Sequence, residues 1–405
     1  MSFARRSFRS PWSWLPVLGL ALACQPVIRT SSPSSSGAPP PARPTTTPAP
    51  TPAARPAPVN PMVELASGSL HTCGRRKTGD VLCWGRNDYG QLGDGRRRDS
   101  VRLVKAGSLT DATQLAAGHD FTCALRKGGS VVCWGNNFDG QLGDGRGARS
   151  GAMSLRPTRV GGLGEAVQIS AGQYHACALE RGGTVKCWGS SENGQMGDDS
   201  ARAFARPMAI ERLGPVSQVA SGWSHVCALE KAGQVKCWGR NTEGQLGDGK
   251  SGSRIKPVVV TGIKTGVELV SGHNHTCART RDGGLWCWGD NSAGQLGAGA
   301  RGEPKAYTPV RMQNLGRVVA LEGGARHHCA RLDSGRVTCW GNNDAGQLGT
   351  RATPRPSPPT TLRGIEDAID VALGERHTCV LRKSGNVSCF GDAKESALGP
   401  YGPKR

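Results

Sequence analysis

Seven pairs of cysteines recur at a nearly constant interval along this 405-residue chain. The two cysteines of every pair are ten positions apart, and successive pairs begin 50 to 54 residues apart. The pairs are Cys73 with Cys83, Cys123 with Cys133, Cys177 with Cys187, Cys227 with Cys237, Cys277 with Cys287, Cys329 with Cys339, and Cys379 with Cys389. A period of this length is typical of supersecondary units stacked in a row or set around a ring as propeller blades. We therefore expect seven copies of one small unit.

The residues around each pair repeat as well. A glycine stands five positions before the first cysteine, a tryptophan follows the second in six copies, and a Gly-Gln-Leu-Gly motif comes next. Phe390 replaces the tryptophan in the seventh copy. The chain has 59 glycines and is only 37% hydrophobic. This composition argues against a helical bundle or a doubly wound parallel sheet and favours short strands joined by glycine turns.

The ten-residue spacing predicts a β-hairpin in which the two cysteines face each other. In the second copy the loop is residues 127–129, and the third loop residue is glycine in all seven copies. A three-residue loop is a type I turn followed by one left-handed residue, a position that favours glycine. Arg126 and Ser130 then close the loop as a hydrogen-bonded pair. Cys123 and Cys133 consequently fall opposite each other at a non-hydrogen-bonded position, within reach of a disulfide.

Seven disulfides, one in each hairpin, are therefore expected in an exported chain. Free buried thiols are one alternative, and metal binding by the cysteine pairs is another. Zinc fits the spacing poorly, because zinc sites favour cysteines two residues apart in two converging pairs.

Each unit offers two further strands. One precedes the repeated glycine, as in residues 114–117 and 268–270, and the other follows the Gly-Gln-Leu-Gly motif. The latter is marked by a proline with an apolar residue three positions later, as in Pro157 and Val160, Pro207 and Ile210, Pro257 and Val260, Pro309 and Met312, and Pro359 and Leu362. Because proline is tolerated at a sheet edge, this strand is expected to be the outermost. Four strands in each of seven units predict an all-β fold, a seven-bladed β-propeller of four-stranded blades.

The propeller is assigned to residues 56–405, with the seven repeats at 62–399. No outer strand follows the seventh unit before Arg405. An N-terminal strand at residues 56–60, with Pro56 and Val59 at the proline–apolar spacing, is therefore predicted to complete the last blade and latch the ring.

The N-terminal residues have the pattern of an export signal. Arg5, Arg6 and Arg9 precede an apolar run at 15–23 that is too short to span a bilayer. The end of this run, Leu-Ala-Leu-Ala before Cys24, resembles a bacterial lipoprotein box. This resemblance implies a signal peptide at 1–23 and a lipid on Cys24, and an ordinary secretory signal is the alternative. Residues 24–55, dominated by Pro, Ser, Thr and Ala, are expected to form a disordered, extended stalk.

The repeated unit resembles a known family. Its pattern, Gly-x-x-His-Thr-Cys-Ala-Leu followed by Gly-x-Val-x-Cys-Trp-Gly-x-Asn-x-x-Gly-Gln-Leu-Gly, is similar to the repeat of the regulator of chromosome condensation family over residues 62–399. The resemblance implies a seven-bladed propeller. The family's eukaryotic nuclear member is a guanine nucleotide exchange factor for a small GTPase and binds chromatin, and related exported bacterial propellers resemble protein-binding scaffolds. No residue of this chain matches the functional loops of that nuclear member.

A histidine stands two positions before the first cysteine in six copies, namely His71, His175, His225, His275, His327 and His377. Propeller symmetry could bring these six side chains to one axis, where they could bind a metal or, when protonated, an anion. Alternatively, each histidine fills the same hydrogen-bonding niche in its own blade, and its recurrence favours this interpretation. No metal site and no cofactor are expected, and neither a phosphate-binding loop nor a nucleophile elbow is present in the sequence.

The net charge of +20 is concentrated in loops between the repeats. Arg96, Arg97 and Arg98 form one such loop and are the candidate binding residues, since propeller loops commonly carry recognition. The alternative is a solvated basic surface. Aromatic residues are not interleaved with these arginines, which argues against nucleic acid as the partner.

These features predict a monomeric, non-enzymatic scaffold that binds a protein or an anionic glycan through its interblade loops. It is expected to be exported and held at the outer membrane or surface of a bacterial envelope by its lipid anchor alone. One alternative is an exchange-factor-like regulator of a small GTPase, which requires a cytoplasmic chain with free thiols. Another is an extracellular polysaccharide hydrolase or lyase.

Overall fold

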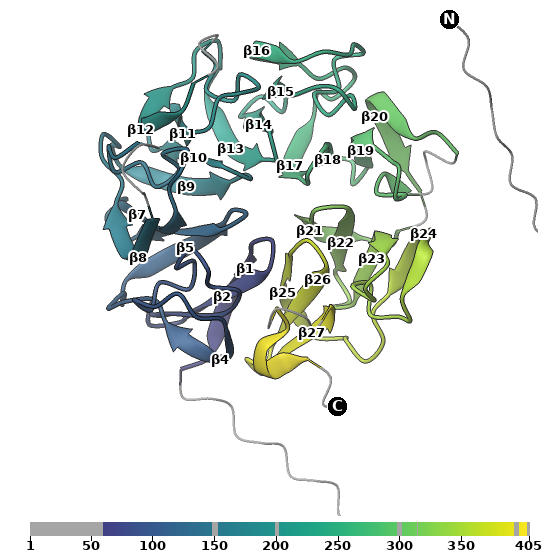
Figure 1. The fold of residues 1–405 in the computed structure, drawn as a ribbon. Helices are drawn as coiled ribbons and strands as arrows, with labels where there is room; N and C mark the ends of the chain where they lie inside the picture. The colour runs from purple at the N-terminus through teal and green to yellow at the C-terminus, as the bar shows by residue number, and fades with distance from the viewer. Residues whose placement is uncertain are drawn as a thin grey trace, which may run out of the picture. The chain divides into compact units, whose positions relative to one another are not determined.

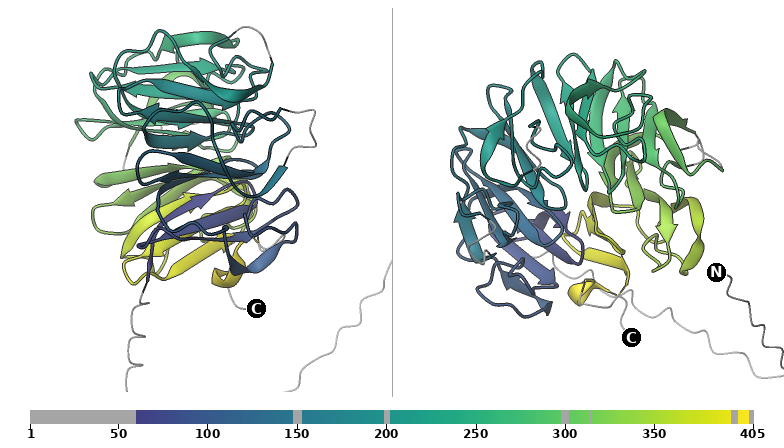
Figure 2. Two further views of the ribbon diagram at one scale, coloured as in Figure 1. Left: turned by 90° about the vertical axis from the view of Figure 1, so that its left-hand side faces the viewer. Right: turned by 45° about the horizontal axis from the view of Figure 1, so that its top comes forward.

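The computed structural model describes residues 60–147, 153–198, 202–297, 302–313, 315–392 and 397–402. These residues form seven antiparallel sheets around a central axis, visible in Figure 1 and in the two further views of Figure 2. The predicted all-β, seven-bladed propeller is confirmed. The expected signal peptide, Cys24, the stalk and residues 56–59 of the expected latch lie outside the described residues.

Each blade is built from strands that follow one another from the axis outward. The innermost strands are β1 (Met62–Ser67), β5 (Ala112–Ala117), β9 (Ala166–Ala171), β13 (Val216–Ser221), β17 (Gly266–Ser271), β21 (Val318–Gly323) and β25 (Ala368–Leu373). The second strands are β2 (His71–Arg76), β6 (Phe121–Arg126), β10 (His175–Glu180), β14 (His225–Glu230), β18 (His275–Thr280), β22 (His327–Leu332) and β26 (His377–Arg382). The third strands are β3 (Val81–Gly85), β7 (Val131–Asn136), β11 (Val185–Gly189), β15 (Val235–Gly239), β19 (Leu285–Asp290), β23 (Val337–Asn343) and β27 (Val387–Gly391). The outermost strands are β4 (Ser100–Lys105), β8 (Met153–Arg159), β12 (Phe204–Ala209), β16 (Arg254–Val259), β20 (Lys305–Met312) and β24 (Thr353–Thr361), and a short 3-10 helix, η3 (Gly399–Tyr401), follows β27.

Six blades have the four strands expected. The seventh sheet, β25-β26-β27, has three strands among the described residues. The first inner strand, β1, packs beside the last, β25, so blades one and seven are neighbours and the ring is closed. None of the described segments is a helix with the length and apolar character needed to cross a membrane.

The cysteine hairpins have the predicted register, because in every blade the two cysteines lie directly opposite each other on the second and third strands. The opposed residues are Cys73 with Cys83, Cys123 with Cys133, Cys177 with Cys187, Cys227 with Cys237, Cys277 with Cys287, Cys329 with Cys339, and Cys379 with Cys389. Their Cα atoms lie 4.0 to 4.1 Å apart and their sulfur atoms 2.04 to 2.12 Å apart, at disulfide distance. In the second blade the N–H of Arg126 donates to the carbonyl of Ser130 (2.8 Å), which closes the loop as expected.

The loop glycines explain why this position is never occupied by another residue. The third loop residue has a φ between 77° and 97° in all seven hairpins, a conformation that disfavours side chains. The second blade differs from the prediction in one respect. Gly128 also has a positive φ, 80°. A left-handed residue at this point makes the turn type II rather than type I.

The outer strands confirm the edge assignment of the prolines. Strand β24, whose sequence is Thr-Pro-Arg-Pro-Ser-Pro-Pro-Thr-Thr, pairs only with β23. Proline has no N–H group to donate to a neighbouring strand. This costs no hydrogen bond on the outer side of an edge strand, because that side faces no other strand. The apolar residue three positions after the marked proline is buried in every case, for example Val160 and Val260.

The hydrophobic core is divided into seven clusters, each shared by two neighbouring blades. The cluster between blades two and three joins Leu125 and Val131 of one blade to Trp188 of the next. Propeller sheets are twisted and stack face to face, so every blade buries both faces against its neighbours. A single blade therefore has no complete core of its own.

Candidate functional site

The six repeated histidines do not form a ligand set at the axis. All six are fully buried, with 0% of their surface exposed. Each ring lies between its own blade and the next. Its Cε1 atom sits against the repeated glycine of its blade, so that a Cβ on Gly68, for instance, would collide with His71 and with the carbonyl of Gly118. Among the described residues, no three His, Cys, Asp or Glu side chains are arranged to hold a metal ion.

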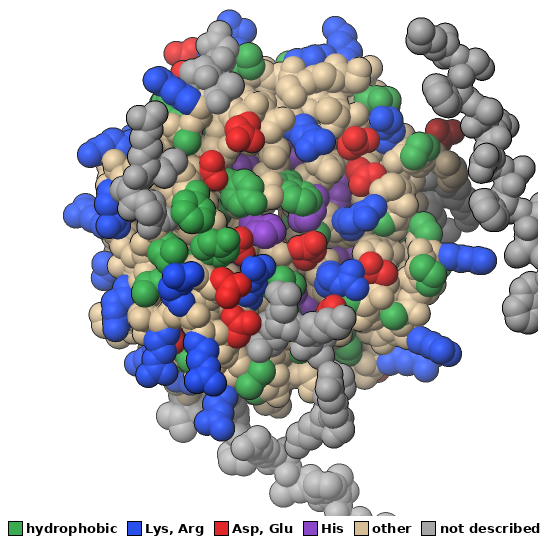
Figure 3. Space-filling model, in the orientation of Figure 1, with side chains coloured by type: hydrophobic (Ala, Val, Ile, Leu, Met, Phe, Trp, Pro, Cys, Tyr) green, Lys and Arg blue, Asp and Glu red, His purple; other side chains and the backbone are tan. Residues whose placement is uncertain are grey.

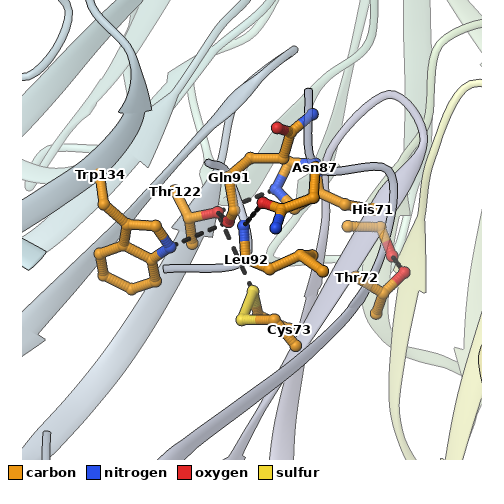
Figure 4. Close-up of a disulfide and its surroundings, with 10 residues drawn as sticks. His71, Thr72, Cys73, Asn87, Gln91, Leu92, Thr122 and Trp134 are labelled. Carbon is orange, nitrogen blue, oxygen red and sulfur yellow. Dashed lines mark hydrogen bonds between the residues drawn. A yellow bond between two sulfur atoms is a disulfide. The ribbon is translucent and has the colours of Figure 1, made fainter. Parts of the chain in front are cut away.

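Four of these histidines hydrogen-bond to a threonine of the next blade. The Nε2–Oγ1 distances are 2.8 to 2.9 Å for His71 with Thr122, His225 with Thr276, His327 with Thr378, and His377 with Thr72. In Figure 4 the hydroxyl of Thr122 in turn donates to the carbonyl of Gln91 (3.0 Å). Since that proton is used, Nε2 of His71 is the donor to Thr122. Burial lowers the pKa of His71 to about 3, which keeps the imidazole neutral.

The other two repeated histidines, His175 and His275, have no threonine opposite them in the next blade. His175 faces blade four, where Val226 stands in place of threonine, and neither of its ring nitrogens has a partner among the described residues. His275 instead packs edge-on against His328, with ring centroids 4.5 Å apart. Burial lowers the pKa of His175 to about 4 and that of His275 well below 6.5. These rings therefore carry no charge with which to attract an anion.

The rest of the repeated motif joins the blades. Trp134 donates from its indole N–H to the carbonyl of Gln91 at 2.9 Å, and the N–H of Leu92 donates to the side-chain oxygen of Asn87 at 3.0 Å (Figure 4). The same tryptophan bond recurs at four further junctions, from Trp188 to Gln141, Trp238 to Gln195, Trp288 to Gln245, and Trp340 to Gln295. The constant part of the repeat thus serves the fold.

The predicted basic loop lies at the surface between β3 and β4. Arg96, Arg97 and Arg98 are all exposed. The loop backbone is shaped by Asn87, whose side-chain N–H donates to the carbonyls of Arg96 and Arg98 at 3.1 Å. The guanidinium of Arg97 also donates from Nε to the carbonyl of Asp88 at 2.7 Å. The three arginines are thus exposed on a defined loop.

A second surface, which the sequence reasoning missed, surrounds one end of the axis. The residue after each repeated glycine donates its backbone N–H to a carbonyl of the following blade at 3.0 to 3.3 Å. The links run from Ser69 to His119, His119 to Gln173, Gln173 to Trp223, Trp223 to His273, His273 to Ala325, Ala325 to Gly374, and Glu375 to Ser69. The last link closes a complete circle. We call the seven residues after the glycines the axial mouth.

Aromatic side chains crowd one side of the axial mouth. The rings of His119 and Trp223 are nearly parallel, with centroids 6.5 Å apart, and those of Trp223 and His273 are 3.7 Å apart. Tyr174 tilts against His119 at 5.9 Å. Burial lowers the pKa of His273 to about 3, so this ring is neutral. Figure 3 shows histidine side chains at the hollow centre of this face, among hydrophobic, acidic and basic groups.

Polar groups at the axial mouth add directional contacts. His119 shares a 2.7 Å hydrogen bond with the carboxylate of Asp120. Although burial raises it, this bond lowers the pKa of Asp120 below its usual value. A cavity of about 100 Å³ opens here on the axis. Ser221, Ser271 and Trp223 line it, and their buried hydroxyl and indole donors have no partner among the described residues. Such donors suit a ligand that brings acceptor oxygens or an ordered water.

A sequence signal for this site does exist. The two positions after the repeated glycine vary from copy to copy, as in Gly118-His119-Asp120 and Gly222-Trp223-Ser224. The glycine before them is constant, and the residue after them is histidine in six copies and Phe121 in the second. Positions that vary between otherwise similar repeats indicate residues that the fold of the repeat does not require. That these positions share one mouth becomes visible only when the ring is closed.

Comparison with known families agrees with the repeat. The model described as RCC1-like domain matches residues 34–302. Models described as Regulator of chromosome condensation (RCC1) repeat match residues 282–331 and 334–381, and also 318–347 and 368–395. A search of curated proteins gave no match.

Solved propellers share the fold at low sequence identity. Human WBSCR16 is 23% identical with a TM-score of 0.71, over 82% of this chain and 89% of that one. Prp20p of Saccharomyces cerevisiae, studied for its binding to Gsp1p and histones, is 21% identical with a TM-score of 0.67, over 82% and 83% of the two chains. Yeast RCC1 (Prp20) bound by Kap60 is 22% identical with a TM-score of 0.71, over 85% and 82%. At these identities the likeness concerns the fold alone.

Proposed function

The chain belongs to the family of RCC1-like domains, and from that premise we propose that it is a non-enzymatic scaffold that binds a protein or an anionic glycan at a bacterial envelope. In this proposal the protein is exported, and Cys24 carries the lipid that anchors it. The seven cysteine pairs at disulfide distance favour an oxidising compartment. The yeast structures named above concern proteins that bind other proteins, which favours protein recognition by analogy.

The observation that carries the proposal is the axial mouth. Histidines, tryptophans and glutamines of the repeat are used between blades. By contrast, the half-buried rings of Tyr174, His119 and Trp223 lie next to one another at an open surface. Half-buried aromatic rings are enriched where proteins bind partners, because they offer a large apolar face at low entropic cost. Arg96, Arg97 and Arg98 supply a second surface, whose charge would assist encounter with an anionic partner.

Crosslinked capture from envelope fractions tests the two surfaces separately. The full chain is compared with a Trp223→Ala variant and with a variant in which Arg96, Arg97 and Arg98 are all changed to Ser. Trp286→Ala is the matched control, because Trp286 is another half-buried tryptophan and lies in β19, away from the axial mouth. We expect Trp223→Ala to abolish capture of a defined partner while Trp286→Ala retains it. Loss only with the arginine variant would assign the partner to the basic loop, and unchanged capture by both variants would contradict the proposal.

A thiol count tests the compartment. Protein purified from its own host is denatured without reductant and reacted with a thiol reagent. We expect none of the 14 paired cysteines to react. Fourteen reactive thiols would instead favour a cytoplasmic regulator, for which nucleotide exchange on a small GTPase is the assay.

A further inference from the structure

A carboxylate on the axis of the ring has no partner among the described residues. Glu322 stands in β21, two positions before the repeated glycine of its blade, and lines a cavity of about 210 Å³ between the inner strands. No described residue donates a hydrogen bond to this carboxylate or forms an ion pair with it. The cavity adjoins the one of about 100 Å³ at the axial mouth, since both are lined by Ser67, Ala117, Ala171, Gly323 and Leu373. We call the two adjoining cavities the axial channel.

The position of Glu322 is occupied by small or apolar residues in the other six blades. In blade six, Glu322 lies opposite Cys329, the first cysteine of the hairpin. The residues opposite the corresponding cysteines are Ala66, Ala116, Ser170, Ala220, Val270 and Ala372. The fold therefore does not require a charged side chain at this position. Because structural residues recur with the repeat, the single glutamate indicates a role other than folding.

Two other glutamates near the axis have basic partners. They occupy the third position of their inner strands. In blade one, Glu64 forms an ion pair with Arg75 at 2.5 Å. In blade five, Glu268 forms an ion pair with Arg279 at 2.8 Å. Each arginine stands directly opposite its glutamate on the second strand, so the charges of these two carboxylates are already balanced.

Blade six lacks this ion pair. Ala320 stands at the third position of its inner strand, opposite Arg331. The acidic side chain comes two residues later, at Glu322, beyond ion-pair distance of that arginine. Burial, followed by the charges of Asp370 and two further carboxyl groups, raises the pKa of Glu322 well above its usual value. A positively charged group placed in the axial channel would therefore be stabilised by this carboxylate.

The inner cavity also offers backbone acceptors. Where the third residue of an inner strand is glutamine, its amide N–H donates to a carbonyl of the next inner strand, as Gln114 does to Ile169 at 3.3 Å. Glu64 instead accepts the N–H of Leu115 at 2.9 Å and has no N–H for the carbonyl of that leucine. The same holds for Leu65, whose N–H donates to a carboxylate of blade seven at 2.7 Å. Both leucines line the cavity, so its lining has more acceptors than donors.

The axial mouth offers the opposite chemistry. Ser221 is only 8% exposed, and its hydroxyl has no hydrogen-bond partner among the described residues. The indole N–H of Trp223 is also without a described partner, and both side chains line the mouth cavity. From the mouth inward, the axial channel thus passes from unpaired donors to unpaired acceptors. A ligand that matches both parts has a carbonyl oxygen at one end and a cationic group at the other.

We propose that the axial channel receives a lysine side chain presented by a bound protein. The peptide carbonyl of this lysine faces Ser221 and Trp223, and its ammonium group donates to Glu322. Glu322 lies three residues before Ala325 of the axial mouth, a depth of at most about 11 Å, which the extended lysine and glutamate side chains span together. A compact ammonium group with three donors suits one carboxylate and neighbouring carbonyls better than a planar guanidinium does. The inference rests on the proposed binding of a protein and names the residue that this protein inserts.

Titration with a lysine derivative tests the site without the partner. The probe is Nα-acetyl-lysine N-methylamide, and its control is the norleucine analogue, which has the same chain without the ammonium group. Binding of both to the full chain is measured by calorimetry at pH 8. We expect the norleucine analogue to bind at least about tenfold more weakly, the usual effect of losing a hydrogen bond between charged groups. Equal affinities, or no binding of the lysine derivative, would overturn the inference.

Two variants of the full chain test the role of Glu322. Glu322→Ala introduces the residue that four other blades have at this position, so the variant is expected to fold. Glu366→Gln is the control, because Glu366 is exposed and lines neither cavity of the axial channel. We expect Glu322→Ala to weaken binding of the lysine derivative at least about tenfold and Glu366→Gln to leave it unchanged. Equal weakening by both variants would indicate general charge attraction and contradict the site.

Crosslinked capture from envelope fractions separates this inference from the proposed function. We expect Glu322→Ala to reduce capture of the partner at least about tenfold, in line with its effect on the lysine derivative. Capture that Trp223→Ala abolishes but Glu322→Ala leaves unchanged would support the proposed function and overturn the insertion of a lysine. If the unaltered chain captures no partner but binds the lysine derivative through Glu322, the proposed function fails while the lysine site is supported.

Discussion

At the scale of single residues, four of the six buried histidines serve the fold through a hydrogen bond between uncharged groups. The hydroxyl of Thr276 donates to the carbonyl of Gln245 at 3.1 Å, so Nε2 of His225 is the donor to Thr276 at 2.9 Å. The Nδ1 atom of His225 has no partner among the described residues. Burial, with a smaller contribution from nearby His175, lowers the pKa of His225 to about 3. Protonation would therefore require the blades to separate. In the unfolded chain the same side chain regains its ordinary pKa near 6.5.

This difference predicts a pH-dependent stability. Because the unfolded state binds the proton first, His225 costs stability as the pH falls below about 6.5, and the loss grows until the folded pKa near 3 is reached. The His225→Gln variant keeps an N–H donor for Thr276 but has no group that titrates here. When the pH is lowered from 7 to 5, we expect its unfolding free energy to fall by about 2 kcal/mol less than that of the parent. Denaturant unfolding at both pH values measures the difference.

The variant must be compared with the parent, because buried carboxyl groups change the unfolding free energy with pH in the opposite direction to His225. Burial, followed by the nearby charge of Glu64, raises the pKa of Asp370 to about 7 despite hydrogen bonds from the backbone of Leu65 and Val371. Because the unfolded chain releases this proton first, Asp370 lowers the unfolding free energy of the protein as the pH rises from about 4 to about 7. Its contribution is the same in both proteins and cancels. Parallel pH curves for parent and variant would show that His225 is not the titrating group.

At the scale of the structural element, the tryptophan bond to the preceding Gly-Gln-Leu-Gly loop is the recurring link between blades. It is broken on both sides of blade seven. Phe390 has no N–H to offer the carbonyl of Gln347, and the indole N–H of Trp84 in blade one has no partner among the described residues. Phe390 also borders a cavity beside β27. The seventh blade is therefore joined less firmly than the others.

Restoring the consensus residue should strengthen this junction. We expect Phe390→Trp to raise the unfolding free energy by about 1 kcal/mol, the usual net value of one added hydrogen bond. Trp340→Phe is the matched reverse change, since Trp340 donates to the carbonyl of Gln295 at 3.0 Å, and it should lower stability by a similar amount. Thermal and denaturant unfolding of both variants provide the measurement. A destabilised Phe390→Trp would mean that the loop carbonyl is out of reach.

The hairpins could be predicted from sequence because their determinants are local. The ten-residue spacing and the loop glycine fix the register of Cys123 and Cys133 without reference to any other blade. The axial mouth could not be predicted in this way, because His119 and Trp223 belong to different blades and meet only through closure of the ring. The turn at Gly128 was mispredicted for a simpler reason, since either central residue of a turn can be left-handed when it is glycine.

At the scale of the whole molecule, stability comes from a closed circle of shared cores. Every hydrophobic cluster joins two blades, and the backbone bond from Glu375 to Ser69 links the last blade to the first. Each cysteine pair lies within one hairpin, so a disulfide staples a blade internally and no disulfide joins two blades among the described residues. Disulfides at these pairs would stabilise the single blades, while packing and hydrogen bonds between blades hold the ring.

The sharing of cores between blades predicts how the protein unfolds when one cysteine pair is removed. Replacing Cys227 and Cys237 with Ala removes the crosslink of a ten-residue span, which is expected to lower the unfolding free energy by about 3 kcal/mol on the chain-entropy model. Because blade four shares both of its cores with its neighbours, calorimetry should still show a single transition, at a lower temperature. A separate early transition confined to blade four would show that the blades unfold independently, as repeats in an open array do.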